Sequence, residues 1–321
     1  MKVLIVKTSS MGDIIHALPV AHDLKAALGD GVELHWVAEE SFREIPRLAP
    51  GVDRIYVTAF RRWRKHPFSK SVREEISSLK AALEAEHYDV VLDIQGLLRS
   101  GLVCRWTKAH SIGYSFSTLR ERLAGLFYDE RLDLPEELGA VKRYRMAAAQ
   151  VFHYEIDQAH PVFGLQARLK GFMPEGSRYA ALAVNTSRDE KLWPEEHWLA
   201  LGRYLLTRGL SSAFFWGNDV ERERVERLAA ALPGAVVVPR DGLESTAATL
   251  SRAAGVIGVD TGLTHLGAAL GRPSVGIFVS TPTETLKLWG DGPVTSLGGI
   301  GVVPTVEEVI SAFEKVLGES K

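Results

Sequence analysis

The sequence predicts an α/β protein with two doubly wound parallel sheets in tandem, and three observations lead to this prediction. A chain of 321 residues suits two domains of roughly 100 to 200 residues each. Short β-branched segments alternate with longer helical patterns, which is typical of βαβ units. This alternation stops after the first half and starts again near residue 179. Each half should therefore build its own sheet and core.

The first half alternates between strand and helix patterns from its first residues. We expect strands at residues 2–7, 32–38, 54–57 and 88–94, and helices at 13–28 and 70–86. These elements predict a Rossmann-like N-terminal domain over residues 1–160. Residues 161–178 contain several prolines and glycines without a hydrophobic period, so we expect the interdomain linker there.

The second half repeats the pattern over residues 179–321. We expect strands at 179–184, 213–216, 235–238, 256–260 and 274–279, and helices at 198–207, 220–232, 243–253, 262–270 and 305–317. Thr305 is the expected N-cap of the closing helix, with Glu307 and Glu308 in its first turn. Ligands of open α/β sheets bind beyond the carboxyl ends of the strands. Candidate residues are therefore expected in the strand-to-helix loops, and two such sheets could face each other across a cleft.

Composition and missing motifs exclude several classes of protein. The net charge of −2 provides no global basic field for nucleic acid. Cys104 is the single cysteine, so neither an internal disulfide nor a cysteine zinc cluster is expected. The N-terminal apolar run ends at Lys7, too early for a signal peptide, and no stretch is long and apolar enough to span a membrane. Walker, dinucleotide-binding, α/β-hydrolase and HExxH signatures do not occur.

The loop at residues 7–13, Lys-Thr-Ser-Ser-Met-Gly-Asp, leaves the first strand and opens the first helix. Gly12 allows a ligand to approach the backbone, and free amides at a helix start attract anions. Asp13 offers a carboxylate that could take a proton from a sugar hydroxyl. From spacing alone, a helix cap formed by Ser10 or Asp13 is the favoured explanation of this loop.

Two loops of the second half offer groups for a nucleotide sugar. Asp260 follows an apolar strand, and Thr261 and Gly262 then open a helix whose amides suit a diphosphate. Lys191 could neutralise a phosphate. Residues that would assist are Thr186, Ser187 and His265. A capped turn and a solvated loop lysine explain the same residues in purely structural terms.

Residues 54–73 contain seven Lys or Arg and no Asp or Glu. The segment Arg61-Arg62-Trp63-Arg64-Lys65 would attract carboxylates or phosphates, and Trp63 could sit at a membrane interface. Nucleic acid is a rival anion, and a solvated basic face is the structural alternative.

The loop at 7–13, the basic segment at 61–65, Lys191 before Trp193-Pro194, and Asp260-Thr261-Gly262-Leu263-Thr264-His265 occur together in this order. This set resembles the lipopolysaccharide heptosyltransferase I family of glycosyltransferase family 9, and the resemblance covers essentially the whole chain. It implies the GT-B fold, α/β with two Rossmann-like domains. It also implies inverting, metal-independent and cofactor-free transfer of L-glycero-D-manno-heptose from ADP-heptose to a Kdo sugar of Kdo-lipid A, at the cytoplasmic face of the inner membrane.

The resemblance also implies roles for individual residues. Asp13 would be the general base, and Lys191 would assist catalysis while binding donor phosphate. The donor site would be completed by Thr186, Ser187, Glu221 at the adenosine ribose, Asp260 at the heptose, Thr261, Gly262 and His265. The acceptor site would comprise Ser10, Gly12, Arg61, Arg62, Arg64, Lys65 and Arg120.

Gly139 departs from the family pattern, in which a histidine precedes the Ala140-Val141 pair. Two alternative functions are consistent with the fold. One is another GT-B enzyme, such as the second inner-core heptosyltransferase or a nucleotide-sugar epimerase. The other is a non-catalytic protein that clamps a phosphorylated sugar.

Overall fold

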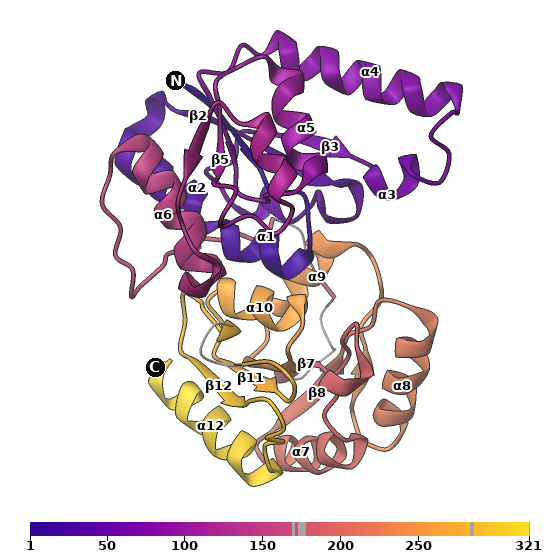
Figure 1. Cartoon of the computed structure of the whole chain (residues 1–321). Coiled ribbons are helices and arrows are strands. Elements are labelled where there is room, and N and C mark those ends of the chain that lie inside the picture. Colours follow the sequence, from indigo (N-terminus) through magenta and orange to yellow (C-terminus); the bar gives the residue numbers. More distant parts are fainter. Residues whose placement is uncertain (169–170, 173–177, 283–285, 321) are drawn as a thin grey trace. The chain divides into compact units, whose positions relative to one another are not determined.

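A computed structural model describes residues 1–168, 171–172, 178–282 and 286–320. The chain forms two compact units, Met1–His160 and Pro161–Lys321, each around its own six-stranded sheet (Figure 1). The linker expected at 161–178 includes residues 169–170 and 173–177, which lie outside the described residues. Among the described residues, no helix is both long and apolar enough to cross a bilayer.

The N-terminal unit has a fully parallel sheet in the order β3-β2-β1-β4-β5-β6. Its strands are β1 (Lys2–Val6), β2 (Glu33–Glu39), β3 (Arg54–Thr58), β4 (Val90–Asp93), β5 (Ser111–Tyr114) and β6 (Glu130–Leu132). Its α-helices are α1 (Met11–Ala17), α2 (Pro19–Leu28), α3 (Phe60–Trp63), α4 (Lys70–Ala85), α5 (Leu98–Thr107) and α6 (Ala140–Phe152). In Figure 1, α2 and α6 cover one face of this sheet, and α4 and α5 cover the other.

The helix expected at residues 13–28 is two helices in the structure, so this prediction was wrong in detail. Pro19 opens α2 directly after Leu18, and proline has no amide hydrogen to continue the hydrogen bonds of α1. The elements β5, β6, α3, α5 and α6 were not predicted from the sequence. The two strands are only 4 and 3 residues long, too short to show a clear alternation.

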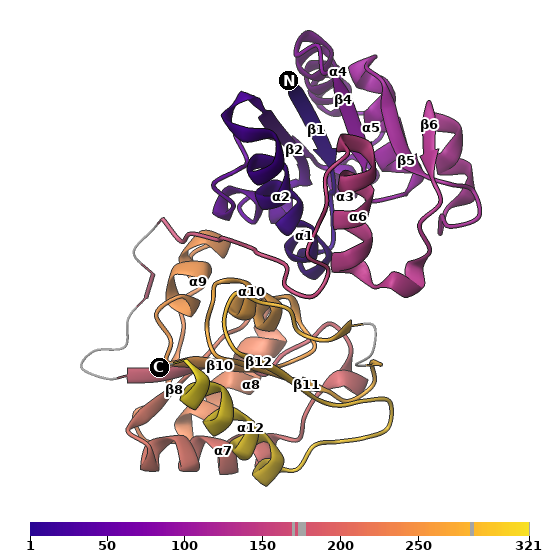
Figure 2. The same ribbon diagram turned by 90° about the vertical axis from the view of Figure 1, so that its left-hand side faces the viewer.

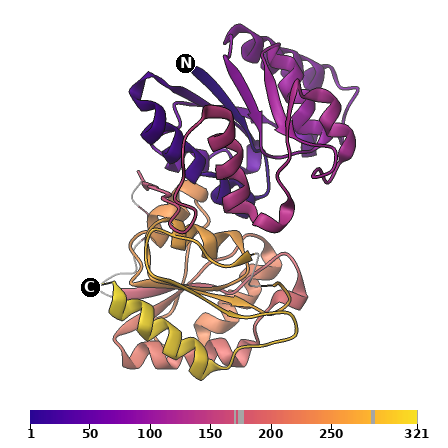
Figure 3. The ribbon, with the colours of Figure 1, turned by 60° about the vertical axis from the view of Figure 1, so that its left-hand side comes forward.

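The C-terminal unit has the fully parallel order β12-β11-β10-β7-β8-β9. Its strands are β7 (Arg178–Ala183), β8 (Leu210–Phe214), β9 (Val236–Val237), β10 (Gly255–Val259), β11 (Ser274–Phe278) and β12 (Val294–Gly298). Its helices are α7 (Glu195–Thr207), α8 (Asp219–Ala230), α9 (Leu243–Leu250), α10 (Gly262–Ala269) and α12 (Val306–Glu319). Figures 2 and 3 show α7 and α12 on one face of this sheet and α10 on the other. The predicted α/β class with two parallel sheets is confirmed.

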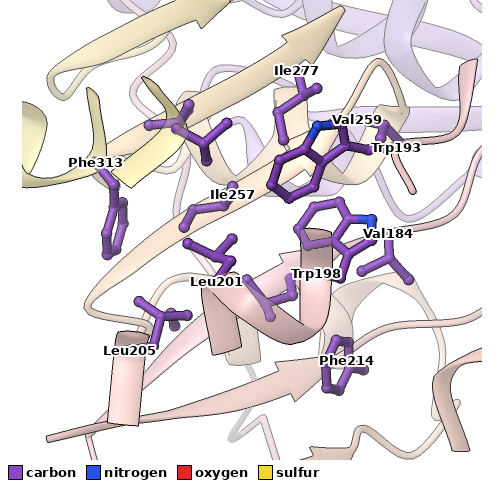
Figure 4. Close-up of a cluster of buried hydrophobic side chains, with 14 of the residues drawn as sticks. Val184, Trp193, Trp198, Leu201, Leu205, Phe214, Ile257, Val259, Ile277 and Phe313 are labelled. Atoms are coloured by element: carbon purple, nitrogen blue, oxygen red, sulfur yellow. The ribbon is translucent and has the colours of Figure 1, made fainter. Parts of the chain in front are cut away.

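The core of the C-terminal unit fixes the loop that contains Lys191. Trp193 and Trp198 are buried and pack edge to face with ring centroids 4.9 Å apart (Figure 4). The indole nitrogen of Trp193 donates to the carbonyl of Pro304 at 2.8 Å. At the next residue, Thr305 caps α12 by accepting from the Glu308 amide at 3.2 Å, as predicted. Lys191 therefore lies only two residues from a side chain anchored in the core.

Both sheets have the same strand order, read from opposite edges, and it is the order of dinucleotide-binding folds. The order reverses between β1 and β4 in the first sheet and between β7 and β10 in the second. These two positions are called the first and the second switch point below. In such sheets the loops after these strands separate and leave a place for ligands. Asp13, Lys191 and Asp260 all come from loops or helix starts at these two positions.

Candidate functional site

The first switch point holds Asp13 in the first turn of α1. Its Oδ2 accepts two hydrogen bonds from Ser10, one from the amide at 2.9 Å and one from the hydroxyl at 2.6 Å. Ser10 and Asp13 thus form the cap that spacing alone suggested. Both of these bonds go to the same carboxylate oxygen.

Lys7 is buried beside this carboxylate, with only 2% of its surface exposed. Its ammonium donates to the Tyr144 hydroxyl at 2.8 Å and lies 4.4 Å from the centre of that ring. Burial lowers the pKa of Lys7 to about 8, although the charges of Asp13 and Asp93 oppose the change. Sequence reasoning included Lys7 in the motif but gave it no role.

The pKa of Asp13 lies below its ordinary value. Burial raises it, but the charge of Lys7 and the two hydrogen bonds from Ser10 lower it by more. The carboxylate is therefore ionised at neutral pH. An ionised carboxylate in a strand-to-helix loop can accept a proton from a substrate hydroxyl.

Two residues that sequence reasoning did not assign to the site shape the loop before Asp13. Gln95, just after β4, accepts from the amides of Thr8 at 3.1 Å and Ser9 at 3.0 Å through its Oε1. Arg99 in α5 donates to the Ser9 hydroxyl at 2.8 Å. A sequence signal for them was available, because residues after β4 must lie at the same switch point.

The basic segment is partly neutralised by the protein itself. Arg62 forms ion pairs with Glu40 at 3.1 Å and Glu75 at 2.9 Å. Trp63 is buried, and its indole nitrogen donates to Glu75 at 2.6 Å. The expectation that Trp63 lies at a membrane interface was therefore wrong: its amphipathic ring packs inward because a carboxylate supplies its hydrogen bond.

The other basic residues remain on the surface. Arg61, Arg64, Lys65 and Arg120 are exposed, and none of the four forms an ion pair with a carboxylate among the described residues. Arg61 instead lies over the ring of Phe42 at 5.4 Å. These four side chains are free to meet an anionic ligand.

Gly139 is the N-cap of α6 and has φ +77° and ψ +153°. This region of backbone conformation is essentially restricted to glycine. The histidine expected from the resemblance could not adopt this backbone conformation without strain. The departure at Gly139 therefore has a local conformational reason.

The second switch point centres on Asp260, the first residue after β10. Its carboxylate pairs with Lys191 and accepts from the Thr281 hydroxyl at 2.8 Å. His265 lies 3.5 Å away, and the Thr186 hydroxyl donates to the Asp260 carbonyl at 3.1 Å. Burial raises the pKa of Asp260, but hydrogen bonds from His265, Lys191 and Thr281 hold it well below its usual range.

Close packing of α10 on β10 places the helix start at this carboxylate. A Cβ at Gly258 would collide with the Thr264 hydroxyl, and one at Gly267 would lie 2.6 Å from Val256. Thr264 is buried and donates to the carbonyl of Val259 at 2.7 Å, so its side chain holds the turn between β10 and α10. Thr261 is the N-cap of α10 and Gly262 its first residue, as the sequence predicts.

Glu221 and Ser187 lie in two other loops of this unit. Glu221 is in the first turn of α8, where its carboxylate accepts from the Gly217 amide at 2.7 Å and from the Asn218 side chain at 2.9 Å. It thereby orders the turn after β8. Ser187 is exposed after β7. Both lie at the carboxyl end of the sheet, where the other candidate donor residues are found.

One convergent group of potential metal ligands occurs among the described residues, formed by Glu33, His35 and Glu86. Glu86 accepts from Lys2 at 2.7 Å and also pairs with Arg54. Glu33 begins β2 and Lys2 begins β1, so the group lies at the amino ends of the strands. It is therefore separate from the switch point that holds Asp13.

Comparisons with known proteins agree with this geometry. Residues 76–312 match the profile of glycosyltransferase family 9 (heptosyltransferase). The chain is 40% identical over 294 residues to lipopolysaccharide heptosyltransferase 1 of Escherichia coli K12, with 91% of each chain covered.

Two solved structures of an E. coli enzyme are similar over nearly the full length. Heptosyltransferase WaaC with ADP gives a TM-score of 0.89 at 36% identity, covering 98% of this chain and 99% of that one. WaaC with ADP-2-deoxy-2-fluoro heptose gives 0.86 at 36% identity and the same coverage. The first of these structures is described as the enzyme with ADP, and the second as the enzyme with an ADP-sugar.

Proposed function

Because the chain belongs to glycosyltransferase family 9, the heptosyltransferases, we propose that it transfers L-glycero-D-manno-heptose from ADP-heptose to Kdo-lipid A. This reaction would be one step in the assembly of the lipopolysaccharide inner core. The observation that carries the proposal is the charged pair of Lys191 and Asp260 at the second switch point, where folds of this order bind nucleotides. The ADP and ADP-sugar named for the E. coli structures support the choice of donor.

In the proposed reaction Asp13 is the general base. A hydroxyl oxygen of the Kdo sugar attacks the anomeric carbon of the heptose, and its proton passes to Asp13. The bond between that carbon and the diphosphate oxygen breaks at the same time, and ADP leaves with the electron pair. A single displacement of this kind inverts the anomeric configuration. The pKa of Asp13 lies below its ordinary value, so the carboxylate is ionised at neutral pH and can accept this proton.

Lys191 balances the negative charge that develops on the leaving diphosphate. An ammonium has three donor hydrogens, so it can retain its bond to Asp260 and still donate to a phosphate oxygen. This positive charge supports a mechanism without a metal ion or other cofactor. The remaining proposed donor contacts are Thr186, Ser187, Thr261 and Gly262 at phosphate, Glu221 at ribose and Asp260 at the heptose, with His265 lining the same pocket.

On the acceptor side, Arg61, Arg64, Lys65 and Arg120 bind the carboxylates and phosphates of Kdo-lipid A, and Ser10 and Gly12 border the reacting hydroxyl. Charge-assisted bonds to such groups are strong and directional. Arg62 forms ion pairs with Glu40 and Glu75. Arg62 would therefore hold α3 in place and also contribute to the basic surface. The enzyme would work as a peripheral protein on the cytoplasmic face of the inner membrane.

The decisive experiment compares Asp13→Asn with the wild-type enzyme, using purified ADP-heptose and Kdo-lipid A. Turnover should fall by about 100-fold or more, while ADP-heptose binding measured by calorimetry stays the same. Asp30→Asn, an exposed carboxylate in the same unit, serves as the matched control and should retain full activity.

Product analysis tests the finer claims on the same samples. NMR of the product should show inversion at the anomeric carbon, and EDTA should leave the rate unchanged. Binding of ADP-heptose without any transfer by the wild-type protein would favour a phosphosugar-binding protein instead. Wild-type turnover by Asp13→Asn would remove Asp13 as the base.

A further inference from the structure

Two side chains with unused hydrogen-bond donors flank the loop before Asp13. Gln95 accepts from the amides of Thr8 and Ser9 at 3.1 and 3.0 Å through its Oε1. These bonds fix the orientation of the Gln95 amide, because its nitrogen could not accept them. Among the described residues no group accepts from Nε2, and this nitrogen is not one of the buried atoms without a partner. Its two N–H groups are therefore open to a ligand.

The turn that carries Gln95 is held from the core of the N-terminal unit. Asp93 ends β4 and is fully buried. Its Oδ1 accepts from the amides of Gln95 at 2.8 Å and Gly96 at 3.0 Å, and its Oδ2 accepts from the Tyr128 hydroxyl at 2.7 Å. Because both carboxylate oxygens are bonded, the Gln95 amide is held in place before a ligand arrives.

Arg99 reaches the same loop from the first turn of α5. Its guanidinium donates to the Ser9 hydroxyl at 2.8 Å, and the residue is exposed. A guanidinium has five N–H groups, and the bond to Ser9 uses one of them. The pKa of Lys7, which burial lowers, is lowered further by the charge of Arg99. The guanidinium therefore lies close to the first switch point.

Gln95 and Arg99 are thus joined through Ser9, and each has N–H groups left for a ligand. A guanidinium beside an amide N–H is complementary to a carboxylate, whose two oxygens can accept from both groups. A neutral sugar hydroxyl would leave the positive charge of Arg99 without a counterpart. The pair therefore favours a ligand with a carboxylate.

We propose that Gln95 and Arg99 bind the carboxylate of the Kdo sugar whose hydroxyl reacts, and thereby select an acidic acceptor sugar. This site rests on the proposed function, which supplies that sugar. Ser9 precedes Ser10, and the Ser10 hydroxyl donates to Asp13 at 2.6 Å. The carboxylate and the reacting hydroxyl belong to one sugar ring, so binding of the first beside Ser9 orients the second toward Asp13. The exposed basic residues proposed for the acceptor then meet its phosphates and any second carboxylate.

The test compares two forms of one water-soluble acceptor. Fully deacylated lipid A with a single Kdo is used as the free carboxylate and as its methyl ester, which keeps every hydroxyl and phosphate. The wild type should prefer the free acid in kcat/KM by at least about ten-fold. Arg99→Met should lower this ratio at least about five-fold. Gln95→Glu keeps an oxygen for the Thr8 and Ser9 amides but places a negative charge against the carboxylate, so it should lower the ratio at least as far.

Matched controls come from the same unit. Arg105→Met, at the other end of α5, and Gln150→Glu, on α6, replace exposed side chains and should keep the wild-type ratio. Ser9→Ala removes the hydroxyl that accepts from Arg99 but leaves the guanidinium, so the ratio should again be that of the wild type.

A purely structural role of Arg99 predicts a different result. Arg99→Met would then slow transfer to both acceptors equally and leave their ratio unchanged. That outcome, an unchanged ratio in Gln95→Glu, or a ratio lowered as far by Ser9→Ala as by Arg99→Met would each overturn the proposal.

Acceptor binding without donor separates this proposal from the proposed function. Calorimetry with the same two acceptors should show that the wild type binds the free acid more tightly and that Arg99→Met removes the preference. This result without any heptose transfer by the wild type would refute the proposed function and support the carboxylate site. Transfer by the wild type with equal kcat/KM for acid and ester would refute the carboxylate site and leave the proposed function intact.

Discussion

Lys7 should make the stability of the N-terminal unit depend on pH in an unusual direction. Its pKa of about 8 lies below the ordinary 10.5, so between these values the unfolded chain binds more protons than the folded one. The free energy of unfolding then rises with pH, at ~1.4 kcal/mol per pH unit for one proton. The charged form costs the fold about 3 kcal/mol below pH 8, and this cost disappears as Lys7 becomes neutral.

Comparison of the wild type with Lys7→Met isolates this effect, because methionine cannot titrate. Between pH 7 and pH 10, the wild type should gain about 2 to 3 kcal/mol of unfolding free energy relative to the variant. Trp36 can report on this unit alone, since it is fully buried in β2 and its indole donates to the Lys7 carbonyl at 3.1 Å. Urea unfolding of 5-fluorotryptophan protein, followed at the Trp36 resonance by ¹⁹F NMR, gives the measurement. A wild-type-to-variant difference that stays constant with pH would refute the reasoning.

Two further predictions concern the C-terminal unit. Asp260→Asn removes the ion pair to Lys191 and weakens the bonds from Thr281 and His265, so the KM for ADP-heptose should rise at least about ten-fold. The circular dichroism spectrum should not change, and the exposed Asp241→Asn variant is the control. Equal KM values for Asp260→Asn and the wild type would argue against the proposed donor pocket. Thr305→Ala removes the cap of α12 and should lower the unfolding free energy by about 1 kcal/mol in urea, whereas Ser320→Ala at the other end of the helix should have no effect. Equal midpoints for Thr305→Ala and wild type would show that the cap is not needed.

The general plan of the fold follows from patterns that a single sequence displays. The central strands are buried on both faces and read as continuous apolar segments, so β1, β7, β10 and β11 were predicted within one or two residues. The edge of the first sheet was not predictable in this way. Its strand β6 has only 3 residues and two of them are exposed, so its position depends on pairing with β5.

Part of the candidate site was predictable because chemistry and position coincide in the sequence. Lys191 and Asp260 each lie between a strand and the next helix, and Asp13 lies in the first turn of the helix after β1. These are the positions where α/β folds place their ligands. Sequence could not show that Lys7 would be buried against Tyr144, a residue 137 positions away. Nor could it show that Glu40 and Glu75 would pair with Arg62, because both carboxylates lie outside the basic segment at 61–65.

The identical strand order of the two sheets has a consequence for engineering. Every ladder of the first sheet closes within Met1–His160 and every ladder of the second within Pro161–Lys321, so no strand would lose its neighbour if the chain were exchanged at residue 160. Each half can be treated as an interchangeable module with its own core. With the donor site proposed for the C-terminal half, chimeras that join this N-terminal half to the C-terminal half of a relative using another nucleotide sugar should show altered donor choice.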